Sequence, residues 1–152
     1  MPRFVPLACL FTLLAAPLAA QGSVVGSWKI SYPAGTRVEN GEQTAIMGTA
    51  LLRIERSGDS LVGELVPDPM PDAPARPPSR MGGREAGGVA TLVRHFTATL
   101  EVNGASQQVA GTSTWRLEVR GEALEGTLSH EVDAMGVMAQ DPGPVRGTRQ
   151  GP

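Results

Sequence analysis

The residues of this chain whose types and spacing could do chemistry are Arg94, Ser113 and His130, which fall on the apolar face of predicted strands. A guanidinium on such a face must meet a carboxylate, backbone carbonyls, water or a ligand, because burying it unpaired is too costly. One hypothesis places the three residues in a ligand pocket, where Arg94 holds an anionic group and Ser113 and His130 orient it. The alternative places them at an open rim, in contact with water.

Patterns for catalysis or metal binding are missing from the sequence. Ser129 and His130 are neighbours in a predicted strand, so their side chains point to opposite faces and cannot act as a pair. There is no Gly-x-Ser-x-Gly segment, no phosphate-binding loop, no His/Cys cluster with zinc spacing and no calcium-loop pattern. We therefore predict no catalytic residue, no metal site and no cofactor, and an enzyme is the least favoured of three functional hypotheses.

The elements that must position these residues are β-strands, and one hairpin occurs twice. Residues 52–65 align without a gap on residues 115–128, and each copy is an alternating strand, a Gly-acidic turn and Leu-x-Gly-x-Leu. No window has a sustained helical apolar period, and 19 glycines mark turns throughout. We predict strands at residues 25–32, 44–56, 60–66, 89–102, 106–119, 122–132 and 144–149.

These strands predict an all-β fold in a single domain that spans residues 21–152. Seven strand candidates at short spacing fit an antiparallel up-and-down β-barrel of seven or eight strands. A β-sandwich is the alternative, because closure of a sheet depends on strand tilt and shear that sequence patterns do not reveal.

The inner face of the predicted sheet follows from a turn at Asn103-Gly104. A two-residue type I′ turn there pairs Val102 with Ala105, and the same register places Arg94 opposite Ser113. Side chains alternate between the two faces of a strand. One face then carries the apolar residues Leu92, Phe96, Ala98, Leu100, Val109, Trp115 and Leu117.

A second turn brings His130 to the same face. A two- or four-residue loop near Arg120 pairs Gly111 with His130, whereas a three-residue bulged loop would shift this register. In the first case His130 lies one row from Arg94. If the interior holds a ligand, we expect the binding residues to be Tyr32, Arg94, Phe96, Ser113, Trp115 and His130.

Residues 67–88 are rich in proline, glycine and arginine and have no periodic apolar pattern. They form a predicted long loop. It is either a functional lid or, in the interpretation we favour, a flexible loop without regular structure. Residues 134–144 are a second predicted irregular stretch. If the barrel is solid, Arg76, Arg80 and Arg84 of the long loop could dock to an acidic partner. The protein would then be a structural or interaction protein of the cell envelope.

Residues 1–20 have the order of a secretory signal peptide. Arg3 supplies a positive charge, the apolar run over residues 4–14 is too short to span a bilayer as a helix, and small residues follow. We predict cleavage after Ala20 and a secreted or periplasmic protein without a membrane span. The single cysteine, Cys9, leaves with the signal, so we expect no disulfide.

Gly26-Ser27-Trp28 opens the first predicted strand. With the repeated hairpins, this motif resembles the lipocalin-like (calycin) β-barrels, in which a Gly-x-Trp near the N-terminus begins strand one. The resemblance implies that Trp28 closes one end of the barrel and that an arginine or lysine near the last strand packs over it. Arg146 and Arg149 are the two candidates for that structural role.

The net charge of −2 argues against nucleic acid as a partner, because phosphate binding requires a basic face. The favoured functional hypothesis is an exported small β-barrel that binds a small, partly apolar ligand, expected to be anionic, in its interior. The identity of the ligand, any protein partner and the oligomeric state stay open at this point.

Overall fold

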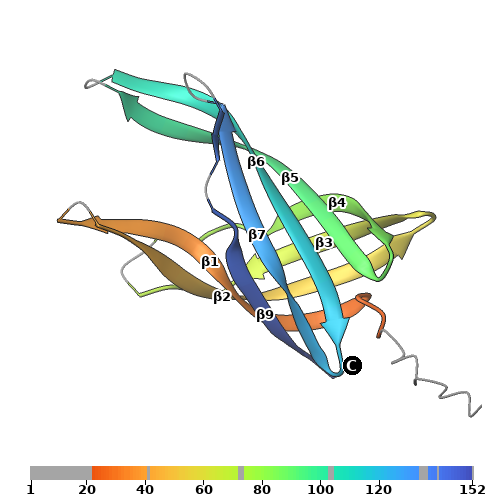
Figure 1. The fold of residues 1–152 in the computed structure, drawn as a ribbon. Coiled ribbons are helices and arrows are strands. Elements are labelled where there is room, and N and C mark those ends of the chain that lie inside the picture. Colours follow the sequence, from red (N-terminus) through yellow and green to blue (C-terminus); the bar gives the residue numbers. More distant parts are fainter. Residues whose placement is uncertain are drawn as a thin grey trace, which may run out of the picture.

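The structure is a computed structural model that describes residues 22–40, 42–71, 74–102, 105–133, 137–139 and 141–151. These residues form strands joined by turns and loops (Figure 1), and none of them belongs to a helix long and apolar enough to cross a membrane. The strands are β1 (Gly26–Glu39), β2 (Glu42–Ser57), β3 (Ser60–Pro67), β4 (Ser79–Ala86), β5 (Val89–Val102), β6 (Ala105–Arg120), β7 (Ala123–Asp133), β8 (Val137–Ala139) and β9 (Gly143–Arg149).

Eight of the described strands close into a barrel. Consecutive strands pair antiparallel from β1 to β7, and β9 pairs with both β7 and β1, so the sheet returns to its first strand. The short β8 pairs with the far end of β7, where Val132 lies opposite Met138. The predicted all-β, antiparallel up-and-down barrel is therefore confirmed, and the sandwich alternative is excluded.

The repeated hairpin has the same register in both copies. Leu52 pairs with Leu65 in the first copy, and Trp115 pairs with Leu128 in the second, as the alignment of the two copies requires. The turn glycine of the second copy, Gly121, has a φ of 62°, and the equivalent glycine of the first copy has a φ of 60°. Residues with a Cβ rarely adopt this conformation. The sequence repeat is therefore a structural repeat.

The predicted register of β5 and β6 is confirmed, whereas that of β6 and β7 is wrong by two residues. Arg94 pairs with Ser113 as expected, although the predicted turn itself lies outside the described residues. The β6–β7 turn begins after Arg120 and contains two residues, so His130 lies opposite Ser113 and not opposite Gly111. Because the shift is by two residues, every side chain keeps its predicted face.

Part of residues 67–88, the segment predicted to be a loop, is strand β4. Its inward positions hold Ser79, Met81 and Gly83, so the sequence lacks the apolar alternation that marks a strand. β4 forms because β3 and β5 supply hydrogen-bonding partners along both of its edges. The prediction of a flexible loop is wrong for the residues of β4. Strand β8 likewise lies within residues 134–144, the second stretch predicted to be irregular.

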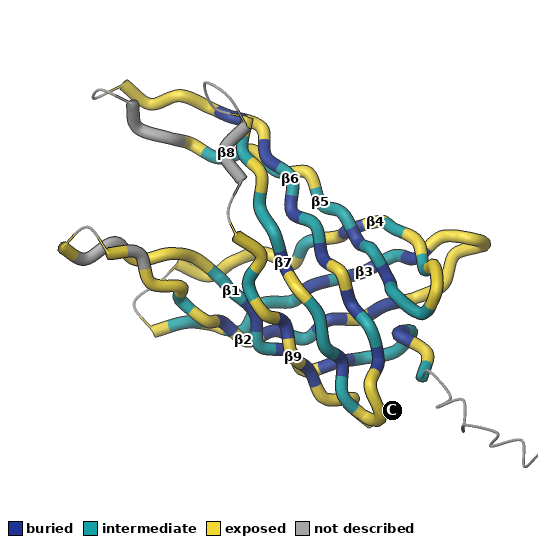
Figure 2. Tube along the Cα trace, viewed as in Figure 1, coloured by how far each residue is buried: buried dark blue, intermediate teal, exposed yellow. Residues whose placement is uncertain are grey.

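The core of the barrel is made of inward strand positions that alternate with more exposed ones (Figure 2). The apolar residues at equivalent inward positions of both copies of the repeated hairpin belong to it. Its large side chains with less than 2% exposure include Trp28, Ile30, Leu52, Ile54, Leu61, Leu92, Leu117 and Leu124.

One end of the barrel is closed by Trp28 and Arg149. Trp28 is fully buried, and its Nε1 donates a hydrogen bond to the carbonyl of Val24 at 2.8 Å. The guanidinium carbon of Arg149 lies 4.2 Å from the indole centroid. The same guanidinium donates to two backbone carbonyls of the preceding segment, at 2.7 and 3.1 Å. Of the two candidate arginines, Arg149 stacks on the tryptophan, and Arg146 is an exposed residue opposite Ser31.

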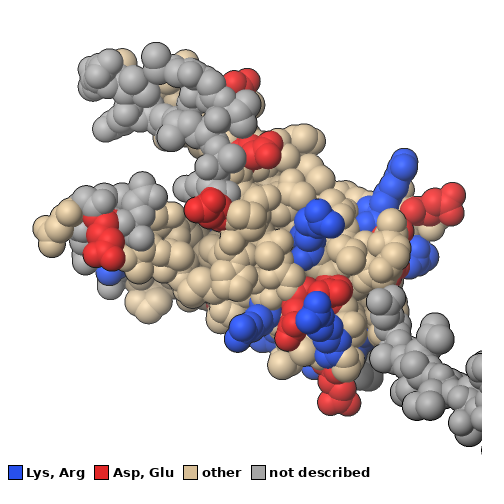
Figure 3. Space-filling view, viewed as in Figure 1, with Lys and Arg blue, Asp and Glu red and all other residues tan. Residues whose placement is uncertain are grey.

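The other end of the barrel is open and carries two hairpin arms, formed by the far halves of β1–β2 and β5–β6 (Figure 1). Beyond Ser31, β1 pairs with β2 alone, and beyond Phe96, β5 pairs with β6 alone. The C-terminus lies at the opposite end. On the face drawn in Figure 3, basic and acidic side chains are interspersed over the body of the barrel.

Gly126→Ala should destabilise the barrel by about 2–4 kcal/mol. The reason is that a Cβ at Gly126 would lie 1.9 Å from the carbonyl oxygen of Arg116 on the neighbouring strand. Gly82→Ala is the matched control, since nothing lies within 4 Å of a Cβ there. Urea unfolding followed by tryptophan fluorescence measures both variants, and equal losses at the two positions would contradict the crowding argument.

Arg149→Gln should lower the free energy of unfolding by about 1–3 kcal/mol, because it removes the stacked cation and its two hydrogen bonds to backbone carbonyls. Arg146→Gln, at an exposed position of the same strand, should change it by less than about 0.5 kcal/mol. Thermal and urea unfolding compare the two. A larger loss at Arg146 would show that Arg149 does not hold this end together.

Candidate functional site

A cavity of about 350 Å³ lies inside the barrel near its open end. Its wall combines hydrogen-bonding side chains with apolar ones, and none of the described aspartates and glutamates contributes to it. The polar members are Tyr32, Arg76, Ser79, Arg94, Ser113 and His130. The apolar members are Pro33, Ala34, Leu65, Pro67, Pro77, Pro78, Met81, Trp115 and Leu128.

Arg94, Ser113 and His130 form one row across β5, β6 and β7 in the wall of the cavity. The pairing of β5 with β6 sets Arg94 beside Ser113, and the pairing of β6 with β7 sets Ser113 beside His130. The Ser113 hydroxyl is hydrogen-bonded to Nδ1 of His130 at 2.9 Å. The corrected register therefore brings the three residues closer together than the sequence predicts.

Arg94 is partly buried, and its guanidinium has no carboxylate partner among the described residues. Its guanidinium carbon lies 5.3 Å from the centroid of the Phe96 ring. A cation over an aromatic face is attracted to it, but the ring accepts no conventional hydrogen bond from the five N–H groups of the arginine. The hydrogen-bonding capacity of Arg94 is therefore directed at solvent or at an occupant of the cavity.

Phe96 is the one predicted binding residue that does not line the cavity. Its ring covers Gly111, where a Cβ would lie 2.4 Å from the ring. It also meets the His130 imidazole edge-on, at a centroid distance of 6.2 Å. Phe96 thus packs against both Arg94 and His130 and helps to position them. It lies two residues beyond Arg94 on β5, toward the β5–β6 arm.

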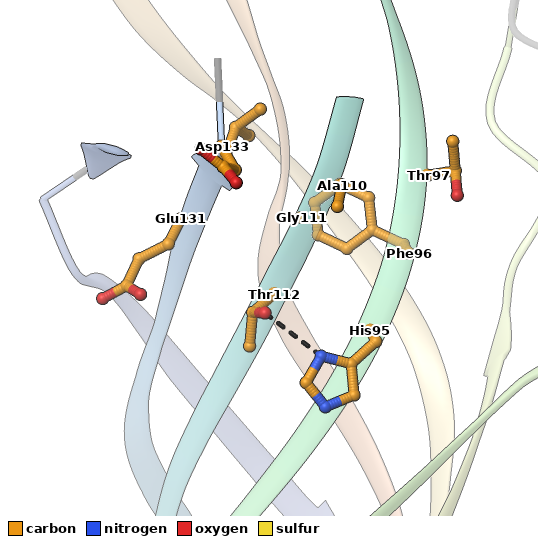
Figure 4. Close-up of a pocket in the computed structure, with 9 residues that line it drawn as sticks. His95, Phe96, Thr97, Ala110, Gly111, Thr112, Glu131 and Asp133 are labelled. Atoms are coloured by element: carbon orange, nitrogen blue, oxygen red, sulfur yellow. Dashed lines mark hydrogen bonds between the residues drawn. The ribbon is translucent and has the colours of Figure 1, made fainter. Parts of the chain in front are cut away.

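A second hollow, of about 550 Å³, lies beside Phe96 at the base of the β5–β6 arm (Figure 4). It is lined in large part by outward residues, among them His95, which is hydrogen-bonded to Thr112 at 3.2 Å. Glu131 and Asp133 on β7 make part of its border acidic and exposed. Because it lacks Arg94 and His130, we take the interior cavity as the candidate site.

Tyr32 and Trp115 bound the cavity on the side of the core. They come from β1 and β6, on different parts of the barrel wall, and their ring centroids are 5.5 Å apart with an interplanar angle of 45°. Both side chains are at most 5% exposed. The two rings therefore form an apolar floor that separates the cavity from the packed core.

A short segment that we call the strap, residues 74–78, borders the cavity just before β4. Nη1 of Arg76 donates a hydrogen bond to the carbonyl of Ala34 at 2.7 Å. Ala34 is the extra residue of a bulge in β1, because the register with β2 shifts between Pro33 and Gly35. Because of the bulge, Ala34 is not paired with a residue of β2. Arg76 of the strap contacts β1 at this residue.

The chain leading to the strap is fixed on the outside of the barrel by Asp68. The Asp68 carboxylate contacts the Lys29 ammonium and the Thr49 hydroxyl, and its backbone N–H donates to the carbonyl of Thr49 at 2.9 Å. The hydrogen bonds from Lys29 and Thr49 hold the pKa of the Asp68 carboxyl below its ordinary value.

The three arginines expected to act together in the long loop are separated. Arg76 lines the cavity, whereas Arg80 and Arg84 are exposed residues of β4. On β4 they alternate with inward residues such as Met81, so they point away from the interior.

Burial lowers the pKa of the His130 imidazole, and the nearby positive charge of Arg94 lowers it further. His130 is therefore neutral near pH 7 and can accept a hydrogen bond from the Ser113 hydroxyl or donate one to it, depending on its tautomer. Because His130 is neutral and Ser113 is uncharged, Arg94 is the charged group of the row.

The Ser113 hydroxyl and the His130 imidazole form the kind of pair in which a histidine activates a serine nucleophile. From the sequence, only Ser129 was considered as the serine of such a pair. In serine hydrolases a carboxylate orients the histidine, but among the described residues His130 has no carboxylate hydrogen-bond partner. Ser113 is also only 1% exposed. This geometry suits a hydrogen-bonding wall better than a nucleophile that must reach a substrate.

The sequence did not place Arg76 and Ser79 at the ligand cavity, because both belong to the segment predicted to be a loop. No periodic signal marks either residue, and only the pairing of β4 with β3 brings Ser79 opposite Leu65 in the wall. The remaining predicted residues, Tyr32, Arg94, Ser113, Trp115 and His130, lie together around one cavity.

Comparison with known proteins gives no match to a family model, to a curated protein or to a solved structure. Within the described part of the chain, no group of three or more His, Cys, Asp or Glu side chains could hold a metal ion. The candidate site therefore has to be interpreted from its own geometry.

The free energy of unfolding should fall as the pH is lowered below about 6.5, the ordinary pKa of histidine. In this range His130 takes up a proton in the unfolded chain but resists protonation in the barrel, so acid favours unfolding until the folded pKa is passed. His130→Gln should reduce this pH dependence, and His95→Gln, at an exposed position, should retain it. Urea unfolding between pH 5 and 8 tests this, and an unchanged slope in His130→Gln would contradict it.

Proposed function

We propose that this protein is an exported small β-barrel that binds a small, partly apolar, anionic ligand in the cavity at its open end. The observation that carries the proposal is Arg94, a guanidinium without a carboxylate partner among the described residues, in the wall of a cavity whose described lining has no acidic residue. A charged group held in this way is stabilised by a bound anion.

The size and lining of the cavity support a small organic ligand. About 350 Å³ falls at the lower end of the range of ligand pockets, which is about 300–1,000 Å³. The floor formed by Tyr32 and Trp115 would receive the apolar part of the ligand, and Arg94 would receive its charged group. Ser113 and His130 would supply neutral hydrogen bonds beside the arginine.

A cavity of this volume also favours ligand binding over the alternative of a solid barrel that works through residues 67–88. That alternative needs Arg76, Arg80 and Arg84 together on one docking loop. Instead, Arg76 is hydrogen-bonded to Ala34 at the border of the cavity, and Arg80 and Arg84 belong to strand β4. We retain no second candidate function.

Export is part of the proposal and rests on the signal-peptide pattern of residues 1–20, with cleavage after Ala20. The lipocalin-like resemblance of Gly26-Ser27-Trp28 is compatible with the eight-stranded barrel and with Arg149 stacked on Trp28. Lipocalin-like barrels with an open end would provide a precedent for an interior ligand, and we extend that use to this chain.

Arg94→Gln should weaken the binding of 1-anilinonaphthalene-8-sulfonate, an aromatic anion, by about tenfold or more, because a charge-assisted hydrogen bond is lost. Arg116→Gln, on the outward face of β6, is the control and should bind as the original protein does. Fluorescence titration gives the dissociation constants, and circular dichroism verifies the fold. Equal affinity in Arg94→Gln and Arg116→Gln would contradict the proposal.

A further inference from the structure

Two arginines line the interior cavity, and neither has a carboxylate partner among the described residues. Arg94 belongs to the cavity wall, and Arg76 of the strap lies at its border. None of the described aspartates and glutamates lines this cavity, and His130 beside Arg94 is neutral near pH 7. The described lining therefore carries two positive charges, of which the proposed function uses only that of Arg94.

Both guanidiniums retain N–H groups that can donate to an acid. Arg76 is exposed, and only its Nη1 is engaged, by the hydrogen bond to the carbonyl of Ala34 at 2.7 Å. Arg94 is partly buried, and its guanidinium carbon lies 5.3 Å from the centroid of the Phe96 ring. Because a guanidinium has five N–H donors, neither contact exhausts the hydrogen-bonding capacity of its arginine.

The two arginines are anchored on opposite sides of the barrel. Arg94 belongs to β5, whereas Arg76 is tied to β1 through the carbonyl of Ala34. In the closed sheet, β2, β3 and β4 separate β1 from β5 in one direction, and β9, β7 and β6 separate them in the other. Strands β1 and β5 are therefore opposed across the interior, and the two guanidiniums are anchored across the cavity from each other.

Most of the remaining lining is apolar and uncharged. The rings of Tyr32 and Trp115 form the floor, and aliphatic side chains such as Leu65, Met81 and Leu128 contribute to the wall. Surface of this kind favours hydrocarbon over a further charged group. The cavity thus combines two cationic positions, anchored on opposite strands, with an apolar lining for whatever joins the groups bound there.

On the basis of the proposed function, we propose that the ligand is an organic diacid, with one carboxylate bound by Arg94 and the other by Arg76. The hydrocarbon that joins the two acid groups lies against the apolar lining. A diacid gives each guanidinium a counter-charge, whereas a monoacid leaves one of them without any. The gain from the second carboxylate is modest, because Arg76 is exposed and solvent screens its ion pair.

Isothermal titration calorimetry of the protein with straight-chain diacids, from succinate to sebacate, and with the half-amide of each tests this ligand class. A half-amide keeps the skeleton of its diacid but replaces one carboxylate with an uncharged amide. The series of lengths is needed because the separation of the two guanidiniums sets the length that fits. At the best length, we expect the diacid to bind about fivefold more tightly than its half-amide.

A variant of Arg76 locates the effect. Arg76→Gln should bring the ratio of the two affinities close to one, because the second carboxylate then has no cation to meet. Loosening of the strap would weaken both ligands alike, so the ratio reports the charge of Arg76. Arg80→Gln, at an exposed position of β4, is the matched control and should retain the full preference. A preference that persists in Arg76→Gln would overturn the assignment of this arginine.

The possible outcomes separate this inference from the proposed function. If diacid and half-amide bind equally at every length, while Arg94→Gln still weakens the binding of 1-anilinonaphthalene-8-sulfonate, the inference is wrong and anion binding stands. Phenyl phosphate carries its negative charge on a single group. If it binds more tightly than every diacid, the two guanidiniums converge on one group and the two-ended ligand is excluded. If neither the acids nor 1-anilinonaphthalene-8-sulfonate bind, the proposed function itself fails.

Discussion

The structure depends on the closure of one sheet, which is completed where β9 pairs with both β7 and β1. Eight strands enclose an interior just wide enough to be filled by side chains, so small differences in side-chain size decide where space remains. At the closed end, the interior is occupied by Trp28 and the neighbouring aliphatic residues, which are buried. Near the open end, small residues such as Ser79 and Ser113 occupy inward positions. They leave space for a cavity next to the rings of Tyr32 and Trp115.

Closure also determines the electrostatics of the cavity. Pairing of β5, β6 and β7 sets Arg94, Ser113 and His130 in one row, and burial beside Arg94 keeps His130 neutral. Opposite charges elsewhere are paired on the outer surface of the barrel, as in the pair formed by Arg53 and Glu64. The described lining of the cavity therefore holds positive charge without a carboxylate, although the chain as a whole carries a net charge of −2. This contrast is the physical basis for proposing an anionic ligand.

Much of the fold could be predicted from the sequence because its signals are local. Alternation and turn residues sufficed for both copies of the hairpin and for the register that pairs Arg94 with Ser113. β4 could not be predicted, since Met81 is its only large apolar residue at an inward position and its partners on β3 and β5 stabilise it. The register of β6 and β7 was ambiguous because a two-residue turn at residues 120–121 and one at residues 121–122 preserve the same faces, and only the whole barrel selects one of them.

By itself, the sequence determined which face of its strand each residue occupies, because alternation is a property of the extended backbone. Arg94 and His130 were placed on the inner face in this way. Only the tertiary structure decided which inner residues meet across the barrel, such as Tyr32 with Trp115, and that the strap brings Arg76 to the border of the cavity. These contacts join residues far apart in the chain, and their positions depend on how the closed sheet bends and staggers its strands.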